Sequence, residues 1–233
     1  MIQVEHLNKQ IGQTSILNDI NLHIGEGEVV GLLGVNGAGK STLMKVLTGL
    51  WQATGKVNVC GVNVLSNPDE VHLHIGYLPE QNPLYTDMYV REYLLFIARI
   101  RCNSRKSKVE SQQSDLEELI ERVGLRPMAN KRIRELSKGY KQRVGLAAAM
   151  MGDPEILILD EPTTGLDPNQ LEDIRALIRE LGKQHTVILS THILQEVKAI
   201  CNRVIIIDHG HVRLDKPLAE IDDLEATFRE NTN

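Results

Sequence analysis

A glycine-rich stretch that ends in lysine and serine carries the strongest chemical signal in the sequence. Residues 34–41 read GVNGAGKS and fit the pattern G-x-x-x-x-G-K-[ST] of a phosphate-binding loop. Glycines let backbone amides approach phosphate groups, and a helix that starts in the loop adds its positive dipole end. We therefore expect Lys40 to reach the β- and γ-phosphates and the Ser41 hydroxyl to bind Mg²⁺. The residues expected to contact a nucleotide here are Gly34, Asn36, Gly37, Ala38, Gly39, Lys40, Ser41 and Thr42.

A pair of carboxylates follows the apolar residues 156–159, where a buried strand is expected to end. Ligands of open α/β sheets bind at the carboxyl ends of the strands. Asp160 can hold Mg²⁺ there through its water shell, and Glu161 can be the general base that polarises the water attacking the γ-phosphate. An acidic pair at a strand end is more often solvated surface, but the phosphate loop upstream favours the catalytic interpretation.

The elements that must position these groups are visible in the apolar pattern. Residues 29–33 form a continuous apolar run, which predicts a strand covered on both faces, and the glycine loop leads into a predicted helix over 41–50. Three more short apolar runs, separated by helical segments, predict a parallel sheet. These runs are residues 156–159, 187–189 and 204–207. Residues 208–211, DHGH, then predict a hairpin turn, and the tail over 218–230 a charged amphipathic helix.

Two further regions differ from this core. Three segments alternate apolar and polar side chains and are expected to pair as half-buried strands: residues 2–7, 16–24 and 56–64. Apolar residues recur at helical spacing over 90–101 and 116–123, which predicts a helical subdomain over about residues 82–150. Its basic residues are expected to be solvated, and they are Arg99, Arg101, Arg105, Lys106 and Lys108.

A second anion site is predicted just before the acidic strand end. In residues 136–140, LSKGY, Ser137 would cap the helix that follows. Its hydroxyl and the free backbone amides of the first helical turn would form an anion site, although no phosphate loop lies nearby in sequence. The same residues resemble the ABC signature sequence, commonly L-S-G-G-Q. Together with residues 34–41 and 160–161, they identify the chain as similar to the ABC ATPase family over nearly its whole length.

The resemblance implies a fold and several residue roles. The fold is α/β, a phosphate-loop NTPase (RecA-like) core with an amino-terminal antiparallel β subdomain and an α-helical subdomain, in one ABC ATPase domain over residues 1–233. Ser137 and Gly139 are implied to bind the γ-phosphate of ATP held by a second copy, and Asp167, in TGLD, matches the D-loop of the nucleotide site. The implied catalytic residues are Lys40, Gln81 of the Q-loop, Glu161 and the switch histidine His192. The implied metal ligands are Ser41, Gln81 and Asp160.

Two longer stretches narrow the resemblance. Residues 77–85, YLPEQNPLY, and 162–170, PTTGLDPNQ, look most like ABC-2 type exporters, and more narrowly like the ATP-binding subunit associated with bacterial gliding motility. This likeness implies an ATPase, with ATP and Mg²⁺, that drives export through a separate integral-membrane permease by ATP-dependent dimerisation. We expect a homodimer, peripheral at the cytoplasmic face of the bacterial inner membrane, whose loop over 82–89 docks the permease.

Composition and charge exclude several classes of protein. A chain of 233 residues with 42% hydrophobic residues can bury a sizeable core, and a net charge of −5 argues against a nucleic-acid partner, which needs a basic face. The amino terminus lacks a signal-peptide pattern, and no segment approaches the roughly 20 apolar residues that cross a bilayer. Cys60, Cys102 and Cys201 lack metal-ligand spacing and are expected to be reduced thiols.

Two alternatives to a transporter ATPase remain at this point. A soluble ABC protein of translation or DNA repair is the first, but such proteins typically carry two cassettes, or long coiled-coil or zinc-bearing insertions, and this sequence shows neither. A nucleotide-binding switch without turnover is the second, and the presence of Lys40, Glu161 and His192 favours hydrolysis over it.

The signature departs from the family pattern at two positions. Lys138 replaces the first glycine and Tyr140 replaces the glutamine, while Ser137 and Gly139 are kept. We expect Lys138 either to point into solvent or to add attraction for the triphosphate held by the partner.

Ile11 also departs from the family pattern and predicts weak discrimination between bases. Most such cassettes place an aromatic residue here, where it stacks on adenine, and no Phe, Tyr or Trp precedes Trp51. Loss of that stacking costs on the order of 1 kcal/mol, which weakens base discrimination without abolishing phosphate binding. We therefore predict modest selectivity for ATP over GTP. Measured affinities for the two nucleotides that differ by several hundredfold would contradict this prediction.

Overall fold

A central sheet of mainly parallel strands organises the molecule. The structure, a computed structural model, describes residues 1–103 and 109–232. Within these ranges the sheet has the order β10-β9-β3-β8-β7-β6, in which β10 runs antiparallel to β9 and the other pairs are parallel. The strands are β3 (Val29–Leu33), β6 (Ile75–Leu78), β7 (Ile156–Asp160), β8 (Thr186–Thr191), β9 (Arg203–Asp208) and β10 (His211–Pro217). The predicted parallel sheet and the hairpin at 208–211 are confirmed.

A second, antiparallel sheet lies at the amino-terminal end, as the alternating segments predict. Its order is β2-β1-β4-β5, and the segment over 56–64, predicted as one strand, is divided by a turn at Cys60 and Gly61 into β4, which pairs with β1, and β5, which pairs with β4. The strands are β1 (Ile2–Ile11), β2 (Thr14–Ile24), β4 (Thr54–Val59) and β5 (Val62–Asn63). Both amino-terminal strands therefore extend further than the alternation alone indicated.

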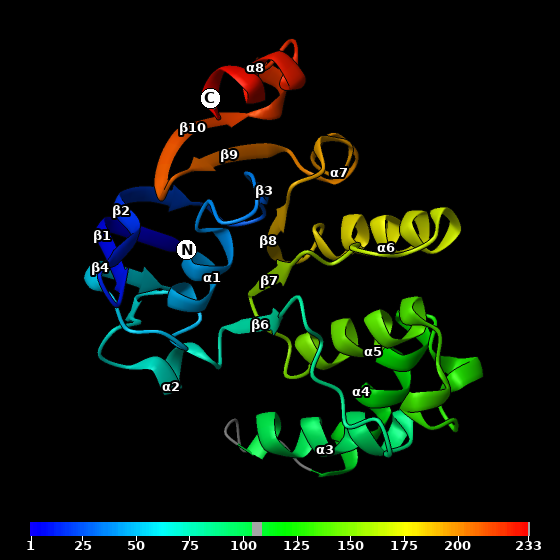
Figure 1. Ribbon diagram of the computed structural model, residues 1–233. Coiled ribbons are helices and arrows are strands. Elements are labelled where there is room, and N and C mark those ends of the chain that lie inside the picture. Colours follow the sequence, from blue (N-terminus) through cyan, green and yellow to red (C-terminus); the bar gives the residue numbers. More distant parts are fainter. Residues whose placement is uncertain (104–108, 233) are drawn as a thin grey trace.

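Helices cover both faces of the central sheet, and α3, α4 and α5 form the lower part of Figure 1. There α3, α4 and α5 gather at the end of the molecule opposite α8, while α1 lies beside the antiparallel sheet. The helices are α1 (Lys40–Leu47), α2 (Pro68–Val71), α3 (Val90–Asn103), α4 (Val109–Arg122), α5 (Lys138–Met150), α6 (Pro168–Leu181), α7 (Leu194–Ile200) and α8 (Leu224–Asn231). The helical region predicted over about 82–150 thus contains α3, α4 and α5.

The apolar run of β7 shows how the sheet divides the core. Successive side chains of a strand point to opposite faces. Leu157 and Leu159 pack in the cluster formed with α3 to α6, whereas Ile156 and Ile158 pack with α1 and the antiparallel sheet. All five residues of β7 are buried. A strand covered on both faces is continuously apolar for this reason, and Asp160 at its end is the first side chain that requires polar partners.

Arg101 corrects the prediction that the basic residues of the helical region are all solvated. Its guanidinium donates hydrogen bonds to the backbone carbonyls of Ala149 (3.2 Å), Met151 (3.0 Å) and Ile75 (2.7 Å). Carbonyls at the carboxyl end of α5 have no partner within the helix, so a planar donor with several N–H groups satisfies them well. Arg99 is exposed as predicted. Arg105, Lys106 and Lys108 lie outside the described residues.

Two other expectations need correction. The tail over 218–230 is not one helix, because a short 3₁₀ turn (Leu218–Glu220) precedes α8 and the Asp223 carboxylate accepts hydrogen bonds from the first backbone amides of α8. Strand β6 was not predicted as a strand, because it is only four residues long and so shows too little periodicity. This omission matters because β6 leads directly toward Glu80 and Gln81.

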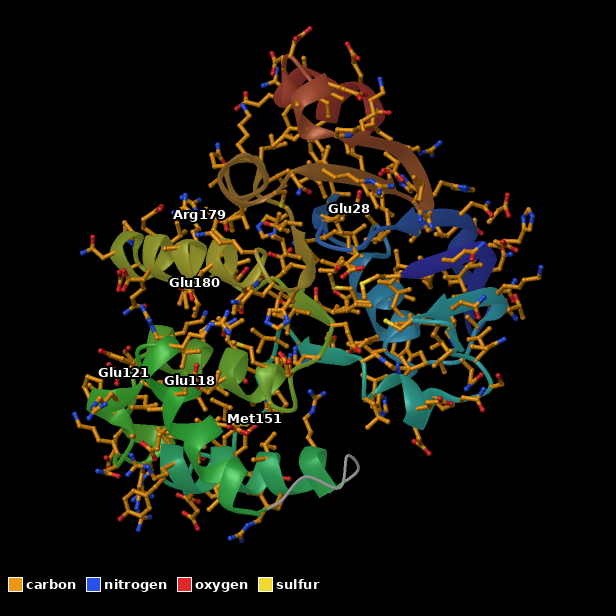
Figure 2. All side chains as sticks on the ribbon, turned by 180° about the vertical axis from the view of Figure 1, so that it is seen from behind. Glu28, Glu118, Glu121, Met151, Arg179 and Glu180 are labelled. Carbon is orange, nitrogen blue, oxygen red and sulfur yellow. The ribbon has the colours of Figure 1, made fainter. Side chains whose placement is uncertain are left out.

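Polar contacts hold α6 against the helical region. The Arg122 guanidinium of α4 donates to the side chains of Glu180 (3.3 Å) and Gln184 (2.7 Å). Figure 2 shows Glu180 on the side of α6 that faces α4 and α5, with Arg179 on the opposite side. No helix among residues 1–103 and 109–232 is long and apolar enough to cross a membrane.

Candidate functional site

The predicted phosphate loop and acidic strand end meet at one edge of the central sheet. Leu33, the last residue of β3, pairs with Thr191 of β8, and Asp160 of β7 pairs with Ser190 of β8. The carboxyl ends of three adjacent parallel strands therefore lie together, as ligand sites of open α/β sheets require. A cleft of about 470 Å³ opens there. Its lining is Ile16, Asn36, Gly37, Gly39, Lys40, Ser41, Thr42, Glu80, Glu161, Thr164 and His192.

The phosphate loop depends on glycines at defined positions. Gly37 (φ +84°) and Gly39 (φ +110°) adopt backbone conformations that residues with a Cβ rarely take. Gly34 is buried, and a Cβ there would collide with the backbone carbonyl oxygen of Ile207 in β9. Residue Gly39 then leads directly into α1, so the amino end of that helix faces the cleft. Ala38 is buried, whereas Asn36 is exposed at the rim of the cleft.

Lys40 is held inside the loop that it terminates. Its Nζ donates to the backbone oxygens of Gly34 (2.7 Å) and Val35 (3.1 Å). Burial lowers the pKa of the Lys40 ammonium, while the carboxylates of Glu161, Asp160 and Glu80 act in the opposite direction. A phosphate group entering the cleft would supply anionic charge close to this ammonium and so favour its charged form.

Asp160 is buried next to Ser41 and does not itself line the cleft, and two hydroxyl groups hold its carboxylate. Its Oδ1 accepts hydrogen bonds from Ser41 Oγ (3.1 Å) and from Ser190 Oγ. Only 1% of Asp160 is exposed, so these bonds offset the cost of burying a carboxylate. A hydroxyl and a carboxylate this close are hard oxygen donors, which fit Mg²⁺, an ion that keeps several waters and is bound by few protein groups beside substrate phosphates.

Glu161, the residue after Asp160, occupies an unusual backbone conformation. Its φ of +49° lies in the left-handed region, which costs a residue with a side chain about 1–2 kcal/mol. The Glu161 amide donates to Ser190 Oγ (3.1 Å), and this bond helps to hold the turn. The turn directs the Glu161 carboxylate into the cleft instead of along the strand.

Two side chains hold the Glu161 carboxylate. His192 Nδ1 lies 2.9 Å from Oε1 and 3.1 Å from Oε2, and the Thr164 hydroxyl donates to Oε2 over 3.0 Å. The side chain of Glu161 is only 8% exposed, whereas that of His192 is 43% exposed. The carboxylate is therefore anchored from inside the protein, while the imidazole faces the opening of the cleft. Such an arrangement can accept a proton from a water molecule and orient it.

The remaining predicted residues lie apart from this cleft. Ser137 caps α5 by accepting a hydrogen bond from the Tyr140 amide (3.4 Å), and Asp167 caps α6 through the amides of Asn169 and Gln170. Neither side chain, nor Gly139, lines the cleft. Gln81 is exposed after β6 and does not line it either, while its neighbour Glu80 does.

Several cleft residues were not found from the sequence. Ser190 and Thr164 were missed as hydrogen-bond partners because single hydroxyl residues carry no spacing signal, although Ser190 precedes Thr191-His192 at a predicted strand end. Ile16 of β2 provides the apolar wall of the cleft. Ile11, the position at which the family has an aromatic residue, is 47% exposed and is not part of the lining.

Comparisons with known proteins agree with this geometry. The family model described as "ABC transporter" matches residues 17–164, more than half of the chain. The chain is 36% identical over 224 residues to the bacitracin transport ATP-binding protein BcrA of Enterococcus faecalis, covering 95% of this chain and 70% of that protein. It is 33% identical over 229 residues to the lantibiotic transport ATP-binding protein SrtF of Streptococcus pyogenes, covering 98% and 96% of the two chains.

A solved structure shares the fold at low sequence identity. The dimeric, post-hydrolysis structure of the ATP-binding cassette MJ0796 bound to ADP and Pi has a TM-score of 0.83 and 26% identity, covering 94% of this chain and 99% of that one. The predicted fold class is thereby confirmed. The narrower likeness to gliding-motility subunits stays a prediction. The family model, the relatives and the solved structure all match, and the chain therefore belongs to the ABC transporter family as an ATP-binding and ATP-hydrolysing subunit.

Proposed function

We propose that two copies of this chain bind two ATP molecules between them and drive export through a separate membrane permease. The two copies lie at the cytoplasmic face of a bacterial inner membrane as peripheral subunits. The observation that carries the proposal is the pair formed by Glu161 and His192, which faces Lys40 across a cleft of phosphate-binding residues. The relatives named for bacitracin and lantibiotic transport support export as the process that hydrolysis drives.

Residues in and beside the cleft have different roles in ATP hydrolysis. Lys40 binds the β- and γ-phosphates, together with the loop amides and the amino end of α1. Ser41 and Asp160 hold Mg²⁺, which neutralises phosphate charge when it is bound. Glu161 accepts the proton of the attacking water, and His192 keeps the carboxylate oriented and contacts the γ-phosphate. Gln81, exposed beside Glu80, reports the state of this site to the loop that follows.

The second anion site explains why two copies are needed. The amino end of α5, capped by Ser137, presents free amides but lies outside the cleft of its own chain. A helix amino terminus favours negative charge. We assign it to the γ-phosphate of ATP bound by the other copy, with Gly139 allowing close approach and Asp167 bordering the same site. The dimeric MJ0796 cassette, in its ADP and Pi complex, supports this arrangement.

An exposed aromatic cluster supports a docking surface for the permease in the predicted loop over 82–89. Tyr85 is 56% exposed, and its ring packs on Tyr93 (centroids 5.9 Å apart) and Phe96 (5.8 Å). Tyr89 (45% exposed) and Ile100 (56% exposed) are further exposed apolar side chains on this segment and α3. Exposed apolar patches of this kind mark interaction sites. The cluster follows Gln81 closely, so nucleotide state and permease contact share one short segment.

Replacing Glu161 by Gln tests the hydrolytic assignment. Gln keeps the size of the side chain but cannot accept a proton, so we expect kcat for ATP hydrolysis to fall by about 10²-fold or more. The variant should then accumulate as an ATP-bound dimer in size-exclusion chromatography with saturating MgATP. Glu118→Gln, on the exposed face of α4, is the control and should hydrolyse ATP normally. A Glu161→Gln protein that still turns over ATP at the normal rate contradicts the proposal.

Replacing Ser190 by Ala tests the support beneath the cleft. The variant removes one donor to the buried Asp160 and one acceptor for the Glu161 amide. We expect the free energy of unfolding to fall by about 1–3 kcal/mol in urea titrations. We also expect kcat to fall roughly tenfold, which corresponds to about 1.4 kcal/mol of lost positioning. Ser66→Ala, at an exposed turn, should change neither quantity.

Replacing Tyr85 and Phe96 by Ser together tests the docking surface. The double variant removes the centre of the aromatic cluster, so the membrane partner that co-purifies with the wild-type chain from native membranes should be lost. Leu50→Ser removes an equally exposed apolar side chain after α1 and should keep the partner. Mass spectrometry of the purified material provides the measurement, and equal recovery of the partner with both variants argues against this surface.

A further inference from the structure

The side chain of Lys138, at the start of α5, lies against the loop that follows β7. The atom nearest to the place that a Cβ would occupy on Gly165 is Lys138 Nζ, and Cε and Cδ follow at 3.4 and 3.8 Å. Gly165 has a φ of +71° and no side chain of its own. The end of the lysine therefore lies where a side chain at position 165 would begin, and it would have to swing aside for one. Neither prediction for Lys138, a solvated side chain or a contact with the partner's triphosphate, included this contact.

A second contact accompanies the first. The side chain of Gln170 in α6 packs where a Cβ on Gly139 would lie, with Cδ 2.8 Å and Cγ 3.0 Å from that position. Gly139 is buried, although the residues on either side of it are exposed or half-buried. The start of α5 and the segment 165–170 thus interlock through two side chains, one from each segment, each lying over a glycine of the other.

The loop under Lys138 also holds the carboxylate of Glu161. Thr164, next to Gly165, donates its hydroxyl to Glu161 Oε2 (3.0 Å) and its amide to the Glu161 backbone oxygen (3.3 Å). The Leu166 amide donates in turn to the Thr163 oxygen (3.3 Å). The path of residues 161–166 therefore determines where the Thr164 hydroxyl lies. Anything that holds Gly165 in place helps to keep the Thr164 bond to Glu161.

We infer that Lys138 is a positioning residue for ATP hydrolysis, which acts by holding the Gly165 loop and through it the hydrogen bond from Thr164 to Glu161. The inference rests on the proposed role of Glu161 as general base. The contact of the lysine stem and tip carries the effect, and the charge does not. In the single chain Lys138 is exposed, so water screens its ammonium.

Two substitutions separate contact from charge. Lys138→Gly removes the whole side chain and leaves the Gly165 loop uncovered, so kcat should fall about three- to tenfold while KM for ATP stays within about twofold. Lys138→Met keeps an unbranched stem of similar length without the charge, and should keep kcat within about twofold of wild type. Lys141→Gly makes the same change one turn further along α5 and controls for the helix propensity of glycine.

The results distinguish the inference from its competitors. A Lys138→Gly protein with wild-type kcat means that the side chain is merely solvated, and overturns the inference. Equal losses in the Met and Gly variants overturn it as well, because charge would then be the active property. In that case the ATP-driven dimer of the Glu161→Gln protein should also weaken on Lys138→Met at low salt, as a lysine bound to the partner's triphosphate requires.

A double-mutant cycle with Gly165→Ala measures the contact directly. A Cβ at position 165 displaces the flexible end of Lys138 and so breaks its contact with the loop, and it is also strained by the positive φ; only the first effect disappears in the Lys138→Gly background. The loss of kcat from Gly165→Ala should therefore be smaller in that background, and equal losses in both overturn the inference. Failure of the proposed function can be told apart from failure of this inference. If the proposed function is wrong, the Glu161→Gln protein with Lys138 intact still hydrolyses ATP, whatever the Lys138 variants do.

Discussion

Parallel pairing of β3 with β8, and of β8 with β7, places the ammonium of Lys40 and the carboxylates of Asp160 and Glu161 at one edge of the sheet. Groups of opposite charge are thereby brought together from positions more than a hundred residues apart. Burial disfavours each of these charges, and each is compensated by fixed partners such as the loop carbonyls for Lys40 and two hydroxyls for Asp160. A shift of any of these groups would leave a buried charge without its partner, so these contacts oppose movement at the proposed phosphate and metal site.

Glu161 shows the cost of this arrangement. A carboxylate that must face the cleft cannot continue the extended path of β7, so the backbone turns into the left-handed region directly after Asp160. Strain of this kind persists only where surrounding contacts over-determine the conformation. Here the hydroxyl of Ser190, the hydroxyl of Thr164 and the imidazole of His192 each hold one part of the residue. The strained residue is the proposed general base, and its strained backbone is what directs the carboxylate into the cleft.

Contiguous patterns were predictable from the sequence, and contacts between distant segments were not. The loop over 34–41, the strand end at Asp160 and the cap at Ser137 each depend on neighbouring residues, so spacing alone identified them. Ser190 and Thr164 act through partners brought close by the sheet, and Arg101 through carbonyls at the end of another helix. Strand β6 escaped prediction because four residues carry too little periodicity. The roles of Gln81 and Asp167 still rest on family resemblance, since neither side chain reaches the cleft within one chain.

The segment after β6 links the cleft to the proposed docking surface for the permease through a series of contacts. Glu80 lines the cleft, and two residues later the side-chain Nδ2 of Asn82 donates to the Lys141 backbone oxygen in α5 (2.8 Å). Asn82 also lies where a Cβ on Gly145 would, so this part of α5 fits closely around it. The aromatic cluster around Tyr85 follows after three more residues. These contacts connect the cleft edge to α5 and to the exposed aromatic surface through one short segment, along which a displacement at the cleft can be passed on.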